Sequence, residues 1–186
     1  MTFDEIYKQV ENIPGWMGRQ DCEALYNAVL NIDGLIVEIG SFMGRSTTIM
    51  AWAAPKSHIV AVDPYFTVHP SSGITEPIEA IKGFINNTTS YDVQLLAKKS
   101  EEIGEEWTLP IDFLHIDGDH HYESVKKDIE LFVPHVKKGS YVYFHDYVVN
   151  GAEEDGGRVK DAVHDMAGTY FDEVKTVSGF AACRKK

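Results

Sequence analysis

Residues 37–47 read Val-Glu-Ile-Gly-Ser-Phe-Met-Gly-Arg-Ser-Thr, and this stretch decides the fold class of the chain. The apolar run at 34–40 that leads into it is short, rich in β-branched residues and closed by glycine, which is typical of a buried strand. Ser46 stands where a helix would begin, and Pro55 ends the helical pattern. The two glycines let the backbone turn tightly and approach a ligand. The stretch therefore predicts a strand, a ligand-binding loop and a helix in succession.

The same alternation of apolar runs and helical segments continues along the chain. We expect strands at residues 58–63, 93–97, 111–117, 140–144, 170–177 and 179–183, and helices at about 2–12, 19–31, 76–88, 121–133 and 158–167, with a short one after Ser100. The glycine-rich, acidic stretch 147–157 is expected to form a surface loop. Strands that alternate with helices predict a mostly parallel sheet with helices on both faces, and ligands bind such sheets at the carboxyl ends of the strands.

The composition is that of an acidic globular protein. With 186 residues the chain is expected to form one domain, 1–186, in which 1–33 form an N-terminal helical cap and 34–186 form the core. Hydrophobic residues make up 44% and charged residues 25%, which excludes a disordered or collagen-like chain. The net charge of −12 repels phosphate backbones and anionic lipids, so we expect neither a nucleic-acid nor a membrane partner. No signal-peptide stretch is recognisable, so the expected location is cytoplasmic.

Acidic residues stand at the ends of the first two expected strands. A dinucleotide-binding loop has the pattern Gly-x-Gly-x-x-Gly, but here the middle glycine is absent and Glu38 precedes the loop. An anion at this point favours a ligand with a cationic amine or sulfonium over a pyrophosphate; a tight turn without any ligand is the alternative. Asp63 ends the second strand, where an acid can accept hydrogen bonds from ribose hydroxyls. Because Pro64 follows it, Asp63 is also compatible with a plain turn.

The fourth and fifth expected strands end in acids and histidines. Residues 113–122 read Phe-Leu-His-Ile-Asp-Gly-Asp-His-His-Tyr, and residues 142–147 read Val-Tyr-Phe-His-Asp-Tyr. Parallel strands lie about 4.8 Å apart, so the two clusters converge if these strands are neighbours. Asp117, His145 and Asp146 would then supply the ligands of a divalent cation. Such a cation lowers the pKa of a hydroxyl bound to it, and Asp119 or His120 would stand nearby as a base.

Both groups of motifs resemble those of one enzyme family. Residues 38–46 and 62–65 resemble motifs of class I S-adenosylmethionine-dependent methyltransferases, and residues 112–129 and 137–147 resemble the small family of macrocin-type and other sugar O-methyltransferases, itself similar to catechol O-methyltransferases. The resemblance covers roughly residues 34–183. It implies a three-layer, Rossmann-like α/β fold with a seven-stranded, mostly parallel sheet, in which 34–186 form the cofactor-binding core. The residues that it assigns to S-adenosylmethionine are Glu38, Gly40, Ser41, Gly44, Ser46, Thr47, Asp63, Ser100 and Asp117.

The resemblance also assigns roles at the other two strand ends. In metal-dependent members the first Asp of Ile-Asp-Gly-Asp and an Asp-Asp pair hold the cation, and the second Asp of that motif is the base. This implies Asp117, His145 and Asp146 as ligands and Asp119 as the base. His145 departs from the pattern, because it replaces an Asp. Either the metal is Mn²⁺ or Fe²⁺ in place of Mg²⁺, or no metal binds and His145, like His120, is a candidate catalytic base.

The sequence therefore predicts methyl transfer from S-adenosylmethionine to a hydroxyl of a small-molecule acceptor, with a divalent cation assisting. Sugars, phenols and catechols all fit an acidic strand end. Two alternatives stay open: a non-catalytic module that binds S-adenosylmethionine to regulate a partner, and a nucleotide-dependent oxidoreductase on a similar fold. The N-terminal helices could cover either the pocket or a neighbouring subunit, so a homodimer is also left open.

Overall fold

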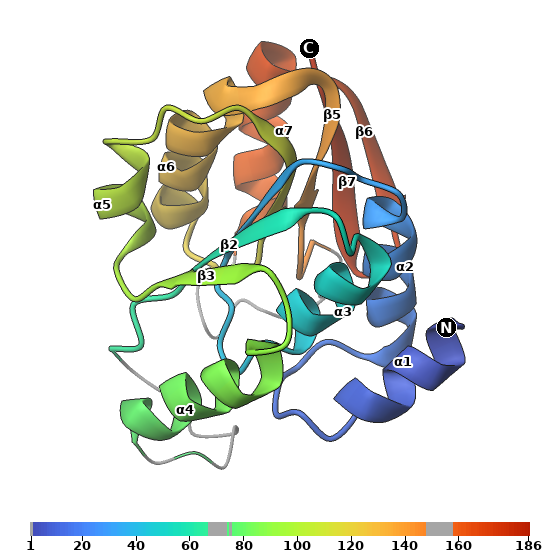
Figure 1. The fold of residues 1–186 in the computed structure, drawn as a ribbon. Coiled ribbons are helices and arrows are strands. Elements are labelled where there is room, and N and C mark those ends of the chain that lie inside the picture. The colour runs from blue at the N-terminus through green and yellow to red at the C-terminus, as the bar shows by residue number, and fades with distance from the viewer. Residues whose placement is uncertain (1, 67–73, 75, 148–157) are drawn as a thin grey trace.

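The computed structural model describes residues 2–66, 74, 76–147 and 158–186 (Figure 1). Its centre is a seven-stranded sheet with the strand order β3-β2-β1-β4-β5-β7-β6. The first five strands pair in parallel, whereas β7 is antiparallel to both β5 and β6. The strands are β1 (Leu35–Ile39), β2 (His58–Val62), β3 (Val93–Leu96), β4 (Ile111–Ile116), β5 (Val136–Phe144), β6 (Phe171–Val177) and β7 (Phe180–Lys185). This order makes β1 and β4 neighbours, although they are far apart in the sequence.

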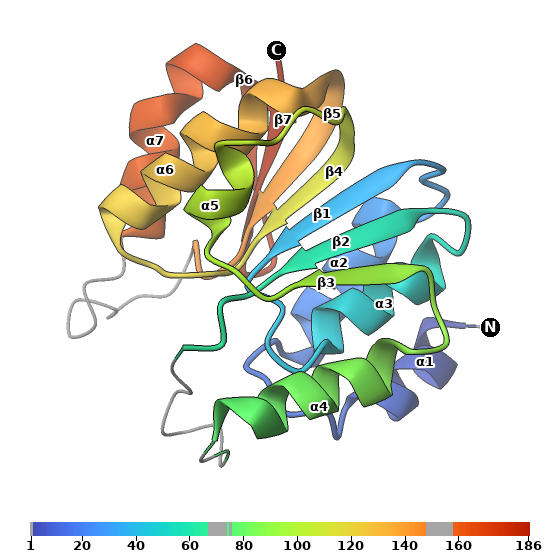
Figure 2. The same cartoon turned by 60° about the vertical axis from the view of Figure 1, so that its left-hand side comes forward.

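Helices cover both faces of the sheet, so the predicted three-layer α/β fold is confirmed (Figure 2). One face carries α1 (Phe3–Val10), α2 (Arg19–Val29), α3 (Arg45–Ala53) and α4 (Pro77–Thr88). The other face carries α5 (Ser100–Gly104), α6 (Tyr122–Phe132) and α7 (Val159–Tyr170). Among the described residues, no helix has both the length and the apolar character that a membrane crossing requires.

The central strands β1 and β2 are mostly apolar because both of their faces are buried. Val37 and Ile39 of β1 pack into the cluster beneath α6 and α7. Side chains alternate between the two faces of a strand, so Ile36 packs into the opposite cluster with Ile49 of α3 and Leu25 of α2. The N-terminal helices are thereby packed onto the same layer as α3. Glu38 lies on this second face as well, which decides its contacts.

Two elements differ from the sequence-based bounds by more than two residues at one end. The fifth strand begins at Val136, four residues before the expected start, because Gly139 adopts a φ of +82° and the strand continues through it. The pairing with β4 shifts register there, between Ile111 and Phe113. The last helix continues to Tyr170, beyond its expected end. Residues 148–157 of the expected surface loop lie outside the described residues.

Candidate active site

Apart from Ser100, which follows β3, the predicted residues lie at or just after the carboxyl ends of β2, β1, β4 and β5, which are consecutive in the sheet. The closest approach joins the loop after β1 to the segment after β4. Gly40 has a φ of +84°, and a Cβ added to it would lie 2.1 Å from the backbone carbonyl oxygen of Asp117. Only glycine can occupy this position without moving the backbone of Asp117. The glycine-rich loop and the acidic cluster are therefore parts of one site.

The loop after β1 presents polar groups toward this edge. Gly44 has a φ of +82° and precedes the first residue of α3, and its amide donates to the carbonyl of Ser41. The first-turn amides of a helix have no intrahelical acceptor and favour an anionic ligand group. The hydroxyl of Ser41 is buried, with 2% of the residue exposed, and it has no hydrogen-bond partner in the part of the chain that the structure describes. A buried, unpartnered hydroxyl beside a glycine cradle fits a polar ligand.

Glu38 is completely buried behind the loop. Its carboxylate accepts hydrogen bonds from the hydroxyls of Ser46 and Thr47 in the first turn of α3. His115 of β4, its register partner, places Nδ1 3.2 Å from Oε1 of Glu38. The carboxylate thus joins β1, β4 and the start of α3. A direct contact of Glu38, Ser46 or Thr47 with a cofactor stays a prediction.

Replacing Glu38 with alanine is expected to lower the free energy of unfolding by about 3–5 kcal/mol, the scale for removing one partner of a buried charged group. The reason is that two hydroxyls and one imidazole would stay buried without their acceptor. Urea unfolding measures the change, and the exposed Glu106→Ala serves as the control, with an expected effect within about 0.5 kcal/mol. A Glu38→Ala protein as stable as the control would show that the carboxylate does not hold these elements together.

Asp63 joins the end of β2 to the glycine-rich loop. Its Oδ2 accepts from the amide of Phe42 at 2.8 Å, and its Oδ1 accepts from the amide of Tyr65 at 2.9 Å. The Tyr65 hydroxyl donates back to the carbonyl of Phe42 at 2.7 Å. Burial raises the pKa of Asp63, and the hydrogen bonds from the two backbone amides oppose that rise. Each carboxylate oxygen can accept more than one hydrogen bond, so Asp63 keeps acceptor capacity for ribose hydroxyls.

Acids and imidazoles gather where β4 and β5 end. His120 places Nε2 3.2 Å from Oδ2 of Asp146 and 4.0 Å from Oδ1 of Asp117. His145 places Nδ1 3.1 Å from Oδ1 of Asp117 and 3.3 Å from Oδ2 of Asp146. Burial alone would lower the pKa of His145, but the two carboxylates outweigh it and raise this pKa to about 11. Nδ1 of His145 thus faces both carboxylates.

The geometry brings a further histidine, His120, to the predicted ligands. Donor atoms of Asp117, His120 and Asp146 all lie within 4.8 Å of one another, so these three side chains could hold one cation. His145 lies behind the carboxylates, 5% exposed. Its Nδ1 hydrogen-bonds Oδ1 of Asp117, and the assignment of His145 as a ligand stays a prediction. Two carboxylates and one imidazole suit Mn²⁺ or Fe²⁺.

Asp119 and Ser100 are engaged with other protein groups. The carboxylate of Asp119 accepts from the Ser124 hydroxyl at 2.7 Å and from the backbone amide of His121 at 3.1 Å, and its Oδ1 also lies 2.5 Å from Nδ1 of that residue. Asp119 is exposed on the segment that follows Asp117, at the start of α6. Ser100 interacts with the buried carboxyl of Asp128 and holds the pKa of that group down, although burial raises it to about 7. The base role of Asp119 and the cofactor contact of Ser100 stay predictions.

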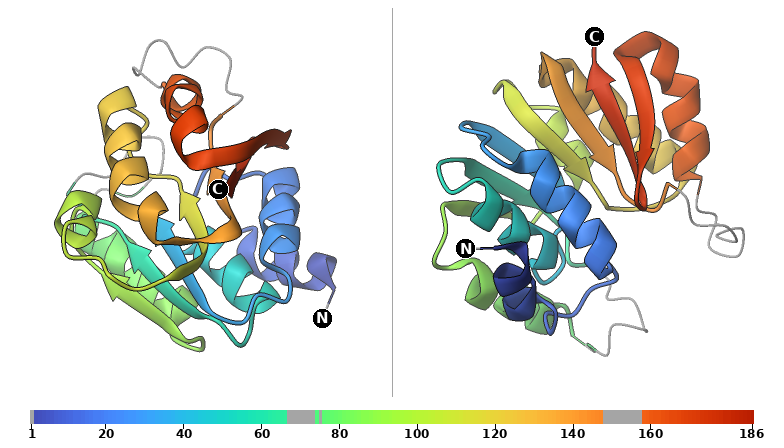
Figure 3. Two further views of the ribbon diagram at one scale, coloured as in Figure 1. Left: turned by 90° about the horizontal axis from the view of Figure 1, so that it is seen from above. Right: turned by 90° about the vertical axis from the view of Figure 1, so that its right-hand side faces the viewer.

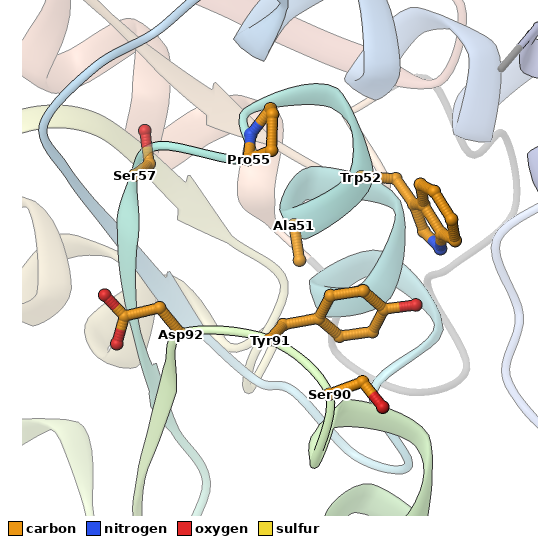
Figure 4. Close-up of a pocket in the computed structure, with 7 residues that line it drawn as sticks. All are labelled: Ala51, Trp52, Pro55, Ser57, Ser90, Tyr91 and Asp92. Atoms are coloured by element: carbon orange, nitrogen blue, oxygen red, sulfur yellow. The ribbon is translucent and has the colours of Figure 1, made fainter.

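A separate cavity of about 240 Å³ lies at the opposite edge of the sheet (Figure 4). It is bounded by the end of α3, the start of β2 and the residues before β3, and its lining comprises Ala51, Trp52, Pro55, Ser57, Ser90, Tyr91 and Asp92. None of the predicted site residues contributes to this lining. The cavity is therefore distinct from the candidate active site.

Comparison with known proteins decides the family. A family model described as a methyltransferase domain matches residues 37–147, which run from β1 past the end of β5 and include both halves of the site. The chain belongs to this methyltransferase family. The match supports S-adenosylmethionine as the cofactor and confirms the resemblance to class I methyltransferases. It also disfavours the oxidoreductase interpretation.

The chain is also similar to individual proteins and solved structures. An uncharacterised protein, R132, of Acanthamoeba polyphaga mimivirus is 30% identical over 127 residues, which are 67% of this chain and 57% of that protein. The chain thus spans a little over half the length of this relative. The cofactor-bound structure of Rv0187 from MTB has a TM-score of 0.70 at 16% identity, with 98% of this chain and 87% of that chain covered. The O-methyltransferase from Bacillus cereus in complex with SAH has a TM-score of 0.64 at 16% identity, covering 99% and 90%. The two structures show that the fold is shared.

Proposed function

We propose that the protein transfers the methyl group of S-adenosylmethionine to a hydroxyl of a small-molecule acceptor, with a divalent cation at Asp117, His120 and Asp146. The observation that carries this proposal is the contact between Gly40 and the backbone of Asp117. That contact puts a loop suited to a nucleoside cofactor directly beside a cluster suited to deprotonating a hydroxyl. A methyl donor and an acceptor oxygen must meet at such a junction.

The cofactor half of the site fits S-adenosylmethionine. Asp63 would accept hydrogen bonds from the ribose hydroxyls, and the hydroxyl of Ser41 and the first-turn amides of α3 would bind polar groups of the methionine part. Gly40 and Gly44 leave the backbone bare, so that the ligand can approach it. The cofactor, when bound, supplies an electrophilic methyl group on a sulfonium. The chain itself contributes position and exclusion of water.

The acidic half of the site favours oxygen as the methyl acceptor. A hydroxyl is a weak nucleophile until it loses its proton, and a divalent cation lowers the pKa of a hydroxyl near it. The donor set of Asp117, His120 and Asp146 fits such a cation. Asp119 follows Asp117 by two residues and stays outside this set, so it is the carboxylate that we assign to take the proton. Together these groups would turn an alcohol or phenol into the attacking nucleophile.

Incubating the purified protein with S-adenosylmethionine, Mn²⁺ and a panel of sugars, phenols and catechols tests the proposal. The expected result is acceptor-dependent formation of S-adenosylhomocysteine and of a methylated product, both identified by mass spectrometry. Tight cofactor binding without turnover on any acceptor would favour the regulatory module. Methylation on nitrogen or carbon would contradict the proposed chemistry and leave the family assignment intact.

Asp63→Ala is expected to weaken the binding of S-adenosylhomocysteine by about 1.5–3 kcal/mol, because hydrogen bonds to a charged carboxylate are worth this much. The unaltered protein should bind in the micromolar range, at roughly −8 kcal/mol. Isothermal titration calorimetry measures both values. The matched control is Asp92→Ala, since Asp92 lies at the opposite edge of the sheet and pairs with His58. Equal affinities of the two variants would remove Asp63 from the cofactor site.

A further inference from the structure

The ring of His145 is held from two sides. Its Nδ1 faces the carboxylates of Asp117 and Asp146, as described above, and its Nε2 lies 3.6 Å from Oδ2 of Asp21. The ring of Phe180 packs against the imidazole, with the two ring centroids 5.0 Å apart. An imidazole whose two ring nitrogens both face carboxylates has one preferred orientation, because a flipped ring would turn carbon atoms toward the acids.

Asp21 is itself fixed in place. Its Oδ1 accepts from the hydroxyl of Ser178 and, at 2.8 Å, from the amide of Gly179, both in the turn between β6 and β7. Figure 3 shows the start of α2 beside this turn. The carbonyl of Gly179 in turn accepts from the amide of Tyr147, next to Asp146. The second carboxylate oxygen of Asp21, Oδ2, faces His145.

We propose that Asp21 is a positioning residue of the candidate active site, which orients the His145 ring and through it the carboxylates of Asp117 and Asp146. Asp21 belongs to none of the methyltransferase motifs described above. It lies on α2, outside the residues that the family model matches. Partners behind the ligands of a metal are known to set ligand orientation and affinity, and losing one typically costs 10–100-fold in metal affinity. Asp21 would act in this way on two carboxylates at once, by means of one imidazole.

The inference rests on the proposed cation at Asp117, His120 and Asp146, and its test measures Mn²⁺ binding directly, without methyl transfer. Asp21→Asn keeps the side-chain shape and a carbonyl oxygen for Ser178 and Gly179, but it removes the negative charge that faces His145. We expect the Mn²⁺ dissociation constant, measured by electron paramagnetic resonance, to rise about 10–100-fold. The midpoint of thermal unfolding and the affinity for S-adenosylhomocysteine should stay close to those of the unaltered protein.

Two control variants separate positioning from simpler causes. Ser178→Ala removes one anchor of Asp21 and leaves its charge, and Asp119→Asn removes a different carboxylate from the same end of the sheet. Both should change the Mn²⁺ dissociation constant by no more than about threefold, well below the 10–100-fold scale. Equal weakening in Asp119→Asn would show a general charge effect, and equal weakening in Ser178→Ala would show an effect of the turn. Either result overturns the proposal.

The outcomes also separate this inference from the proposed function. Unaltered Mn²⁺ affinity in Asp21→Asn, with binding by the parent protein, would refute the role of Asp21 alone. Absence of Mn²⁺ binding by the parent protein would refute the metal and the positioning role together. In that case S-adenosylhomocysteine binding would still report on the methyltransferase assignment.

Discussion

Removing divalent cations with a chelator is expected to lower methyl transfer about 10²–10³-fold. A cation next to the acceptor oxygen stabilises the developing negative charge by several kcal/mol. Each 1.4 kcal/mol corresponds to a factor of about ten in rate. The site that would lose its ion comprises Asp117, His120 and Asp146. Turnover is measured as S-adenosylhomocysteine formed per enzyme, before and after the cation is returned.

Readdition should restore activity better with Mn²⁺ or Fe²⁺ than with Mg²⁺, because one imidazole among carboxylates favours transition metals. His120→Asp would make the donor set all-oxygen, so it should shift the preference toward Mg²⁺. His145→Asp should not produce that shift, since His145 lies behind the carboxylates. The pair of variants therefore tests which histidine is the ligand.

Full turnover in the presence of chelator would refute the role of the metal. The same result combined with a large loss of turnover in His145→Asp would identify His145 as the catalytic base. This is the second of the two alternatives that the sequence leaves open. Under that outcome the acceptor should be an acidic phenol in preference to a sugar alcohol. Comparing the two acceptor classes at equal concentration distinguishes these cases.

Asp119→Asn is expected to lower turnover about 10²–10⁴-fold, the range for losing a general base. An amide occupies the same volume as the carboxylate but cannot accept a proton. Binding of S-adenosylhomocysteine and Mn²⁺ should be retained, because Asp119 lies outside the three-residue donor set. Pre-steady-state turnover together with equilibrium binding of both ligands measures the three quantities separately.

Ser124→Ala is the matched control for Asp119. It removes one hydrogen bond to that carboxylate at the start of α6 and leaves the base itself in place. The hydrogen bonds from His121 and Ser124 outweigh burial and lower the pKa of Asp119, so the control should raise that pKa and change turnover far less than Asp119→Asn does. An Asp119→Asn enzyme as active as the control would assign the proton transfer to another group, with His120 the nearest candidate.

The sequence by itself determined the fold and the place of the site. The alternation of β-branched runs with helical periods predicts the strands and helices because these patterns depend on neighbours along the chain. The parallel connections then bring the strand ends to one edge, so residues such as Gly40, Asp63 and Asp117 could be assigned to one site in advance. The start of β5 was missed, because Gly139 permits a strand to pass through what resembles a turn.

Only the tertiary structure decided which side chains face one another at that edge. His115 pairs with Glu38 because of the register between β1 and β4, which no local pattern encodes. His120 lies with Asp117 and Asp146 in one possible donor set, because the direction of a side chain after a strand depends on the backbone angles of a few loop residues. Asp21 reaches His145 only once α2 has packed beside the β6–β7 turn. Secondary-structure propensity depends on residues that are adjacent in the sequence, whereas these contacts arise from packing between residues that are distant in it.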